Sequence, residues 1–280
     1  MTAVRLDGRE VAEHVKTTLL EAISQLSYKP AIHFIRVGDD PASISYVRGK
    51  DRMATSLGVT SKVHALPEDT SQAEVETLVA ELNHDPDVDG ILVQLPLPNH
   101  LNDQQILVKI DPAKDVDGLH PVNIGRLWAG QDGLFPCTPR GLIAILKHYN
   151  IDVLGKRAMI VGRSNLVGKP AAALLLRGHA TVTLAHSRTQ NLPELCQQAD
   201  ILVAAVGKPG MITADMVKPG AAVLDVGLTR VDGAIKGDVH EDVWDVAGHL
   251  TPMPGGTGRM TVAMLMDNTY RAATMRRAVS

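Results

Sequence analysis

Short apolar runs alternate with amphipathic helical patterns along the whole chain. The runs predict strands at Ala31–Val37, Val63–Leu66, Gly90–Leu95, Arg157–Val161, Thr181–Ala185, Ile201–Val206 and Ala221–Val226. Strands that are apolar on both faces and alternate with helices are typical of parallel sheets covered on both sides. The pattern therefore predicts an α/β protein, and the proline- and glycine-rich stretch from Asp111 to Pro139 predicts a junction with one short helix between two such series.

Capping signals mark where two of the helices begin. Asp40 precedes a proline suited to the first helical position, Pro41, and Gly58 follows the last apolar position, so we expect a helix between them. Ser71 and Glu74 have the spacing of a capping box ahead of another helix. Its apolar face carries Val75, Leu78, Val79 and Leu82, and further helices are expected at Gly8–Leu26 and at about Thr261–Arg277.

Lys50 lies near the centre of the apolar face of the helix that follows Asp40. A turn of about 100° per residue places these residues on that face: Ser43, Tyr46, Val47, Lys50, Met53, Ala54 and Leu57. Lost hydration there would lower the pKa of the Lys50 amine and allow proton exchange near neutrality. Alternatively, the side chain extends along the surface and keeps its ammonium in water. Tyr46, one turn earlier, favours a ligand site because its ring offers a surface for an aromatic ligand.

Composition limits the class of protein without naming it. The chain has 280 residues, 45% of them hydrophobic, which is enough for two domains, and a net charge of −3 does not favour nucleic acid or an anionic membrane as partner. Cys137 and Cys196 are far apart without CxxC spacing, so we expect reduced packing residues. A charged N-terminal segment and the lack of a long apolar run predict a soluble, cytoplasmic protein.

The second series of strands contains a candidate anion site. The strand that ends at Val161 runs into GRSNLVGKP (Gly162–Pro170) and then a helix, so backbone N–H groups at a helix N-terminus could face a pyrophosphate. A purely structural turn is the alternative, because Ser164 replaces the middle glycine of the usual dinucleotide fingerprint. The next strand is followed by HSRT (His186–Thr189) where an NAD site would carry an acidic residue, and this favours NADP.

Several motifs in order resemble the bifunctional methylenetetrahydrofolate dehydrogenase/methenyltetrahydrofolate cyclohydrolase family (FolD-type) over nearly the whole chain. They are VGDDPASISYVRGK ending at Lys50, DGILVQLPLP around Gln94, KDVDGLHPVNIGRL around Asp117, PCTPRG at Pro136–Gly141, VGRSNLVGKP at the glycine turn, and TPMPGGTGRMTVAML from Thr251. The resemblance implies two α/β domains flanking a cleft. We expect a folate-binding catalytic domain with a parallel sheet over residues 1–138, joined by a returning helix in 259–280, and a Rossmann-like NADP-binding domain over 139–258.

The resemblance also implies roles for individual residues. Tyr46 would stack on the folate rings, Asp117 would bind the pterin edge, and Lys50 and Gln94 would lie at the one-carbon unit. The implied catalytic residues are Lys50, Gln94, Tyr46 and Asp117. The implied substrate-binding residues are Tyr46, Lys50, Gln94, Leu95, Pro96, Asp117, Pro254, Gly255 and Gly256. The implied NADP-binding residues are Gly162, Arg163, Ser164, Val167, Gly168, His186, Ser187, Arg188, Thr189, Val206, Gly207, Asp225 and Gly227. No metal is implied; Asp115 and Asp117 suggest a calcium loop, but no ligand series follows them.

The chemistry of these side chains fits the implied reactions. A carboxylate such as Asp117 can accept hydrogen bonds from paired pterin donors. Gln94, expected inside an apolar strand, needs a partner for its amide, and Lys50 is the natural candidate. Lys50 should be neutral or paired during hydride transfer, which leaves a cation on the substrate. In the hydrolytic step, a Lys of lowered pKa can take and return protons.

Two other functions stay open on the residues alone. A non-catalytic NADP sensor would explain the glycine turn but not Lys50 beside Tyr46, and a dehydrogenase of another small cyclic substrate would not explain Asp117 with Gln94. The chain also departs from the usual family reading PGGVGPMT at Thr257 and Arg259. This departure affects how that loop contacts cofactor or folate. The family further implies a homodimer and a tetrahydrofolate derivative as substrate.

Overall fold

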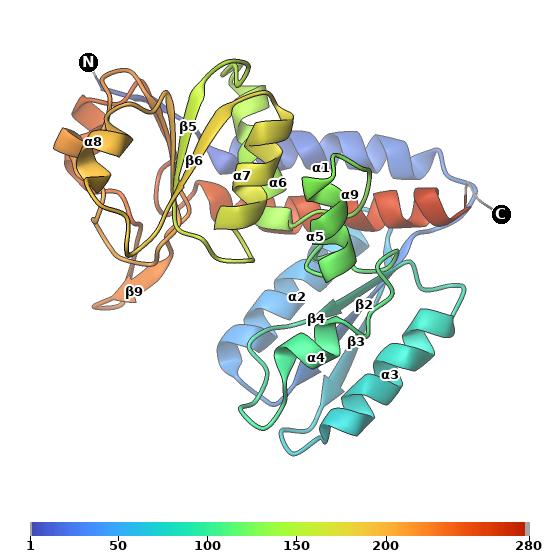
Figure 1. Cartoon of the computed structure of the whole chain (residues 1–280). Coiled ribbons are helices and arrows are strands. Elements are labelled where there is room, and N and C mark those ends of the chain that lie inside the picture. The colour runs from blue at the N-terminus through green and yellow to red at the C-terminus, as the bar shows by residue number, and fades with distance from the viewer. Residues whose placement is uncertain (1, 278–280) are drawn as a thin grey trace. The chain divides into compact units, whose positions relative to one another are not determined.

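The chain folds into two compact α/β units, described here from a computed structural model that covers residues 2–277 (Figure 1). The six-stranded unit contains the residues up to His14 together with Pro136–Thr261. The three-stranded unit contains Val15–Phe135 together with the residues from Val262 on. Every strand pair in the two main sheets is parallel, so the predicted α/β class is confirmed.

The six-stranded sheet has the strand order β1-β11-β8-β7-β5-β6. Its strands are β1 (Val4–Arg5), β5 (Arg157–Val161), β6 (Thr181–Ala185), β7 (Ile201–Ala204), β8 (Ala222–Asp225) and β11 (His249–Leu250). Helices of this unit are α6 (Cys137–His148), α7 (Gly168–Arg177) and α8 (Leu192–Cys196), with the 3-10 turns η1 (Ala214–Met216) and η2 (Glu241–Asp245). The strands β9 (Thr229–Val231) and β10 (Ala234–Lys236) form a separate antiparallel pair.

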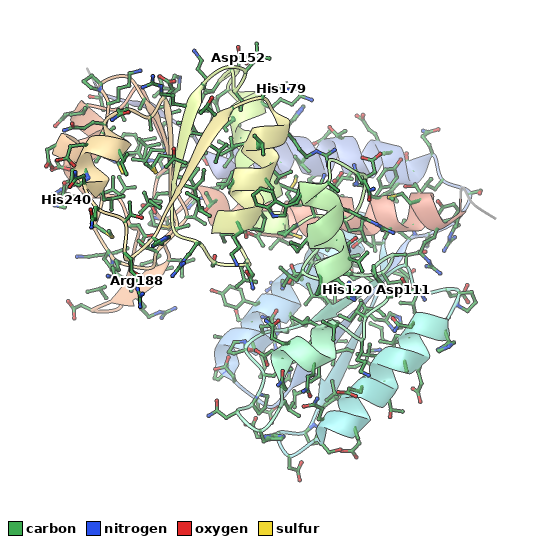
Figure 2. The ribbon with its side chains drawn as sticks, viewed as in Figure 1. Asp111, His120, Asp152, His179, Arg188 and His240 are labelled. Carbon is green, nitrogen blue, oxygen red and sulfur yellow. The ribbon has the colours of Figure 1, made fainter. Side chains whose placement is uncertain are left out.

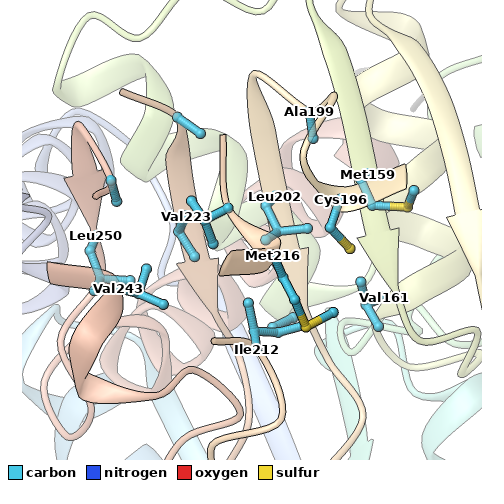
Figure 3. Close-up of a cluster of buried hydrophobic side chains, with 14 of the residues drawn as sticks. Met159, Val161, Cys196, Ala199, Leu202, Ile212, Met216, Val223, Val243 and Leu250 are labelled. Atoms are coloured by element: carbon cyan, nitrogen blue, oxygen red, sulfur yellow. The ribbon is translucent and has the colours of Figure 1, made fainter. Parts of the chain in front are cut away.

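One face of the six-stranded sheet is packed into a continuous apolar cluster (Figure 3). Met159, Leu202 and Val223, from three adjacent strands, meet Cys196 of α8 in this cluster. Burial raises the pKa of the Cys196 thiol to about 11, so the sulfur is protonated at neutral pH. Cys137 is also buried and unbonded to any other cysteine, which confirms that both residues serve packing.

The N-terminal segment belongs to the six-stranded unit, whereas the sequence assigned it to the first domain. Val4 and Arg5 pair in parallel with His249 and Leu250, so β1 forms the edge of that sheet. A strand of two exposed residues is too short to show any alternation of apolar and polar positions. The sequence pattern could not predict β1 for this reason.

The three-stranded sheet has the strand order β3-β2-β4. Its strands are β2 (Ala31–Val37), β3 (Thr60–Leu66) and β4 (Gly90–Val93), and its helices include α2 (Pro41–Ser56), α3 (Gln72–His84), α4 (Asp103–Leu107) and α5 (Pro121–Trp128). The division between the units falls within α1 (Gly8–Ser24) and α9 (Thr257–Arg277). Strands β3, β4 and β7 differ from their predicted bounds by a few residues at one end each.

Local signals in the sequence explain how α2 and α3 flank this sheet (Figure 1). The Asp40 carboxylate accepts a hydrogen bond from Ser43 N at 2.7 Å and caps α2. Ser71 and Glu74 form the predicted capping box at the start of α3. Val75, Val79 and Leu82 of α3 pack on the sheet face that carries Ile35 and Val93, as the helical spacing predicts.

Buried charges hold the ends of two helices in the three-stranded unit. The Lys114 ammonium donates to Leu82 O, Asn83 O and Asp85 O at 2.6–2.8 Å, and so caps the C-terminus of α3. Asp89, which is fully buried, forms ion pairs with Arg276 and Arg277 in the last turn of α9. Each buried charge is therefore matched by hydrogen-bonding groups.

His33 and His64 predict a specific loss of stability in acid. Nε2 of His64 lies 3.1 Å from Nδ1 of His33 across β2 and β3, an arrangement that requires one donor and one acceptor nitrogen. Burial, with the nearby His64 and Lys62, lowers the pKa of His33 from 6.5 to about 4. The unfolded chain then takes up a proton at higher pH than the folded chain, so the free energy of unfolding should fall as pH decreases from 6.5 to about 4.

Urea unfolding of wild type and His33→Gln across this pH range measures the effect. Because glutamine does not titrate, the variant should lose less stability than wild type between neutral and acidic pH. Equal pH dependence in the two proteins would contradict this assignment, whereas a uniform offset at all pH values would only reflect the changed packing.

Within residues 2–277, none of the helices combines the length and the apolar character needed to cross a membrane.

Candidate functional site

Lys50 and Gln94 form a hydrogen-bonded pair in the three-stranded unit. Lys50 Nζ donates to Gln94 Oε1 at 2.9 Å, and Gln94 Nε2 donates to Leu95 O at 2.7 Å. The predicted partner of the Gln94 amide is thereby confirmed. Gln94 lies one residue beyond the end of β4 rather than inside the strand, because the strand pairing stops at Val93. The Gln94 side chain is therefore held by the Lys50 ammonium and by the backbone carbonyl of Leu95.

The apolar face of α2 is narrower than the sequence pattern predicted. Within the helix only Ser43, Val47 and Ala54 are buried, Tyr46 is 56% exposed, and Lys50 is half-buried. A sheet of three strands covers only a narrow stripe of a helix, so residues at the edge of the apolar arc keep contact with solvent. Lys50 is therefore partly exposed, between the two predicted alternatives, with the exposed Tyr46 ring one turn before it.

Asp117 follows a loop that buried groups hold in place. The carboxylate of Asp115 accepts from Gly118 N, His120 N and Asn123 Nδ2 at 2.8–3.2 Å, and burial raises the pKa of Asp115. Asn268 Nδ2 of α9 donates to Val116 O at 2.8 Å. Asp115 is thus committed to hydrogen bonds within the loop itself.

Asp117 and Gln94 each follow a segment that pairs in the three-stranded sheet. Ile91 of β4 is bridged in parallel to Asp115, and Gly118 N donates to Asp115 O, so Asp117 lies in the turn directly after this bridge. Leu95 and Pro96 continue directly from Gln94. Ligands of open α/β sheets bind at the carboxyl ends of the strands, and Gln94, the partner of Lys50, lies at the carboxyl end of β4.

The six-stranded unit contains a cavity of about 300 Å³ at the carboxyl ends of β5, β6 and β7. Six of the predicted NADP-binding residues line it: Gly162, Arg163, Ser164, His186, Ser187 and Val206. The loop after β6 continues to Arg188, which Figure 2 shows at the opposite end of the sheet from Asp152 and His179. Its lining combines apolar side chains such as Leu192 and Met211 with polar ones, as a nucleotide site requires.

Close backbone contacts shape the wall of this cavity. Gly162 has φ +124°, and a Cβ there would collide with Ala205 O, so only glycine fits the turn. Ser164 Oγ accepts from Val167 N and Gly168 N at 3.1 and 3.4 Å, at the start of α7. The hydroxyl of Ser164, which stands at the middle glycine position of the fingerprint, therefore stabilises this turn. Beyond β6, His186 N donates to Thr189 Oγ1.

Asp225 and Gly227 lie outside the lining of this cavity, in contrast to their predicted place in the NADP site. Asp225 is 2% exposed, and its carboxylate accepts from Gly227 N, Asp238 N and Val239 N. Desolvation raises its pKa to about 6. The carboxylate is therefore turned toward its own loop, which a strand-end position in the sequence cannot reveal.

Asp238 is a buried residue that the sequence interpretation missed. Its carboxylate accepts from three consecutive backbone N–H groups, those of Val206, Gly207 and Lys208, at 2.6–3.0 Å. Val206 and Gly207 were predicted to bind NADP, and their backbone N–H groups donate to the Asp238 carboxylate. The only signal in the sequence is the Gly237–Asp238 pair after a turn, which many surface loops share.

The loop that contains Pro254, Gly255 and Gly256 belongs to the six-stranded unit and packs on the start of α1. Gly8 N donates to Gly255 O at 3.1 Å, and a Cβ on Gly8 would collide with Gly256 O. The Thr257 hydroxyl donates to Asp225 O at 3.3 Å, a bond that the valine of the usual family reading could not make. Arg259 is exposed in the first turn of α9.

A glycine turn over a cavity on a parallel sheet, together with a Lys–Gln pair at a second sheet, defines a dinucleotide-dependent α/β enzyme. Residues 6–117 match the model of the tetrahydrofolate dehydrogenase/cyclohydrolase catalytic domain, and residues 136–277 match that of the NAD(P)-binding domain. The chain belongs to the tetrahydrofolate dehydrogenase/cyclohydrolase family.

Similar proteins support this assignment over the full length. The bifunctional protein FolD of Thermus thermophilus is 54% identical over 277 residues, which are 99% of this chain and 98% of that protein. The crystal structure of the FolD enzyme from Campylobacter jejuni has 43% identity and a TM-score of 0.95, covering 98% of this chain and 99% of that one. The FolD structure from Trypanosoma brucei, complexed with NADP cofactor and an inhibitor, has 36% identity and a TM-score of 0.91 over 100% and 99% of the two chains.

The comparisons confirm the family that the sequence motifs indicated and the enzyme class that it implies. The chain is a bifunctional dehydrogenase and cyclohydrolase of tetrahydrofolate chemistry with an NAD(P)-binding domain. In the part of the chain that the structure describes, no group of three or more His, Cys, Asp or Glu side chains is arranged to hold a metal ion.

Proposed function

We propose that the chain oxidises 5,10-methylenetetrahydrofolate to the 5,10-methenyl form with NADP⁺ and then hydrolyses it to 10-formyltetrahydrofolate, with Lys50 and Gln94 as the catalytic pair. The observation that carries this proposal is the 2.9 Å hydrogen bond from Lys50 Nζ to Gln94 Oε1 at the carboxyl end of the three-stranded sheet. Residues of this unit bind the folate, and residues of the six-stranded unit bind the dinucleotide.

The folate is held by an open ring and a carboxylate. Tyr46 is more than half exposed, so its ring is available for stacking on the pterin without any rearrangement of α2. Asp117 can accept the paired N–H donors of the pterin edge, and the loop before it is fixed by Asp115 and Asn268. Leu95 and Pro96 continue the surface from Gln94.

Charge determines the role of Lys50 in the two steps. NADP⁺, when bound, accepts a hydride from the methylene carbon. The product of that step is a cation, so Lys50 must share its proton with the Gln94 oxygen or be neutral while it forms. In the hydrolytic step, water adds to the methenyl carbon and loses a proton as the ring opens. Lys50 takes that proton from the water and returns it to the ring nitrogen that leaves, and the second proton of the water is released to solvent as the hydroxyl becomes the formyl carbonyl.

The dinucleotide preferred is NADP rather than NAD. Arg163 lines the cavity, and the loop after β6 offers hydroxyl and guanidinium groups at Ser187 and Arg188. These donors suit a 2′-phosphate, whereas an NAD site uses an acidic residue for the ribose hydroxyl. Val167, Gly168 and Thr189 complete the site by shaping the turns around the phosphates.

Replacing Arg163 with Ala should raise the KM for NADP⁺ by about tenfold, the equivalent of one charge-assisted contact to phosphate. The KM for NAD⁺ should change little, because NAD⁺ has no 2′-phosphate. Initial rates with each dinucleotide measure both values. Arg157→Ala is the matched control, since Arg157 lies at the amino end of the same strand that Arg163 follows. Equal increases for the two dinucleotides would contradict this role.

The proposed activity is tested with the purified protein, 5,10-methylenetetrahydrofolate and NADP⁺. Formation of NADPH followed by the 10-formyl product is the expected result. NADP⁺ binding without turnover would indicate a sensor, and turnover of a different cyclic substrate alone would indicate another dehydrogenase. We further propose a cytoplasmic homodimer with no nucleic-acid or membrane partner; sedimentation at several protein concentrations tests the assembly.

A further inference from the structure

Two buried carboxylates support the turn at the end of β7 from behind. Asp238 is fully buried and Asp225 is 2% exposed. Asp238 accepts from the N–H groups of Val206, Gly207 and Lys208, and Asp225 accepts from Gly227 N, Asp238 N and Val239 N. Six backbone donors therefore satisfy two carboxylates in a continuous chain of hydrogen bonds.

The chain packs closely around these carboxylates. A Cβ on Gly227 would collide with the Asp238 carboxylate, and a Cβ on Gly237 would collide with Oδ2 of Asp225. Segments 225–227 and 237–239 are therefore pressed together with the carboxylates between them. An isolated parallel bridge between Ile212 and Val239 pairs segment 237–239 with the part of the chain that follows β7.

The turn that Asp238 holds faces the dinucleotide cavity. Val206 and Lys208 line that cavity, together with Gly162 and Arg163. Three successive N–H groups that converge on one point form a nest that would otherwise attract an external anion. Here the nest is filled by the chain's own carboxylate, which leaves the Val206 and Lys208 side chains to form the wall of the cavity.

Asp225 extends the same support toward a second loop. Its backbone N–H donates to Thr251 Oγ1 at 2.7 Å, and its carbonyl accepts from the Thr257 hydroxyl. These two threonines stand on either side of the Pro254–Gly256 loop. One buried residue is therefore bonded to the supports of both the dinucleotide turn and the glycine loop.

We propose that Asp238, backed by Asp225, is a positioning residue that fixes the Val206–Lys208 turn for dinucleotide binding without touching the dinucleotide. This inference rests on the proposed function for the identity of the ligand. Its chemical basis is that a carboxylate offers two acceptor oxygens to three N–H groups, whereas a carboxamide offers one oxygen and turns an NH₂ group toward donors.

The test compares Asp238→Asn with wild type by three measurements. The Kd for NADP⁺, from titration without folate, should rise about tenfold or more, because at least one charge-assisted hydrogen bond is lost. Hydrogen exchange at the amides of Val206, Gly207 and Lys208 should accelerate in the free protein. Hydrolysis of 5,10-methenyltetrahydrofolate, which uses no dinucleotide, should keep its wild-type kcat and KM.

Asp200→Asn is the matched control, because the Asp200 carboxylate also accepts a backbone N–H, that of Arg157, but at the amino end of the sheet. It should leave the Kd for NADP⁺ unchanged. Unaltered NADP⁺ affinity in Asp238→Asn, or a parallel loss of NADP⁺ binding and of hydrolysis, would overturn the positioning role. Wild type that binds no NADP⁺ would instead contradict the proposed function, while the exchange measurement still reports on the turn.

Discussion

Replacing Lys50 with Met should lower cyclohydrolase turnover by about a thousandfold, which is within the range that a positioned proton-transfer group contributes. Methionine keeps the length and apolar stem of lysine but removes the amine that donates to Gln94 Oε1. The protein should still fold, because Lys50 lies at the border of the buried stripe of α2. Binding of NADP⁺ should persist, because the dinucleotide cavity is lined by residues of the other unit. Hydrolysis of 5,10-methenyltetrahydrofolate, followed by its absorbance, measures the change.

Lys109→Met provides the matched control for this experiment. Lys109 is an exposed lysine of the same unit, so the same chemical substitution there should leave turnover unchanged. Wild-type cyclohydrolase rates in Lys50→Met would refute the assignment of Lys50 as the proton-transfer group. A loss of NADP⁺ binding in that variant would also contradict it, since a local amine should not affect the dinucleotide.

Replacing Lys114 with Met should destabilise the protein by about 3 kcal/mol or more, the cost of leaving buried acceptors without their charged donor. The ammonium of this 1% exposed residue donates to Leu82 O, Asn83 O and Asp85 O at the C-terminus of α3. Methionine fills a similar volume but offers no donor, so the three carbonyls lose their common partner. Urea unfolding at neutral pH measures the difference in free energy.

The Lys109→Met variant again separates the specific effect from a general effect of the substitution. Its free energy of unfolding should match that of wild type, because an exposed lysine makes little contribution to stability. Lys114→Arg should also destabilise, since a larger planar group does not fit the site of a compact ammonium. A Lys114→Met protein as stable as wild type would show that water replaces the ammonium at the helix end.

Periodicity and capping signals were sufficient to predict most of the fold. The strands at Ala31–Val37 and Thr181–Ala185 agree with prediction residue for residue, because an apolar run bounded by turn residues is a clear local signal. The capping box at Ser71 also has the predicted geometry, since its two partners lie within one turn. Structural features that depend on residues close together in the sequence can be predicted directly from it.

Long-range packing explains what the sequence could not show. The helical arc left two alternatives for Lys50, because its burial depends on the elements packed against α2, and no local pattern encodes them. The family resemblance placed Asp225 in the NADP site, yet its carboxylate accepts from the backbone N–H groups of Gly227 and Asp238. The role of Asp238 depends on the turn at Val206, far away in the sequence, so no motif could indicate it.

The pairing of Val4 and Arg5 with His249 and Leu250 has a consequence for how the protein is made. A ribosome must synthesise the chain through Leu250 before this edge strand meets its partner, so the six-stranded sheet cannot be completed until all its other strands have been made. A recombinant fragment that starts at Pro136 would leave the outer strand uncovered and prone to self-association. β1 is therefore synthesised before the other strands of its sheet, yet it can pair only after β11 has been made.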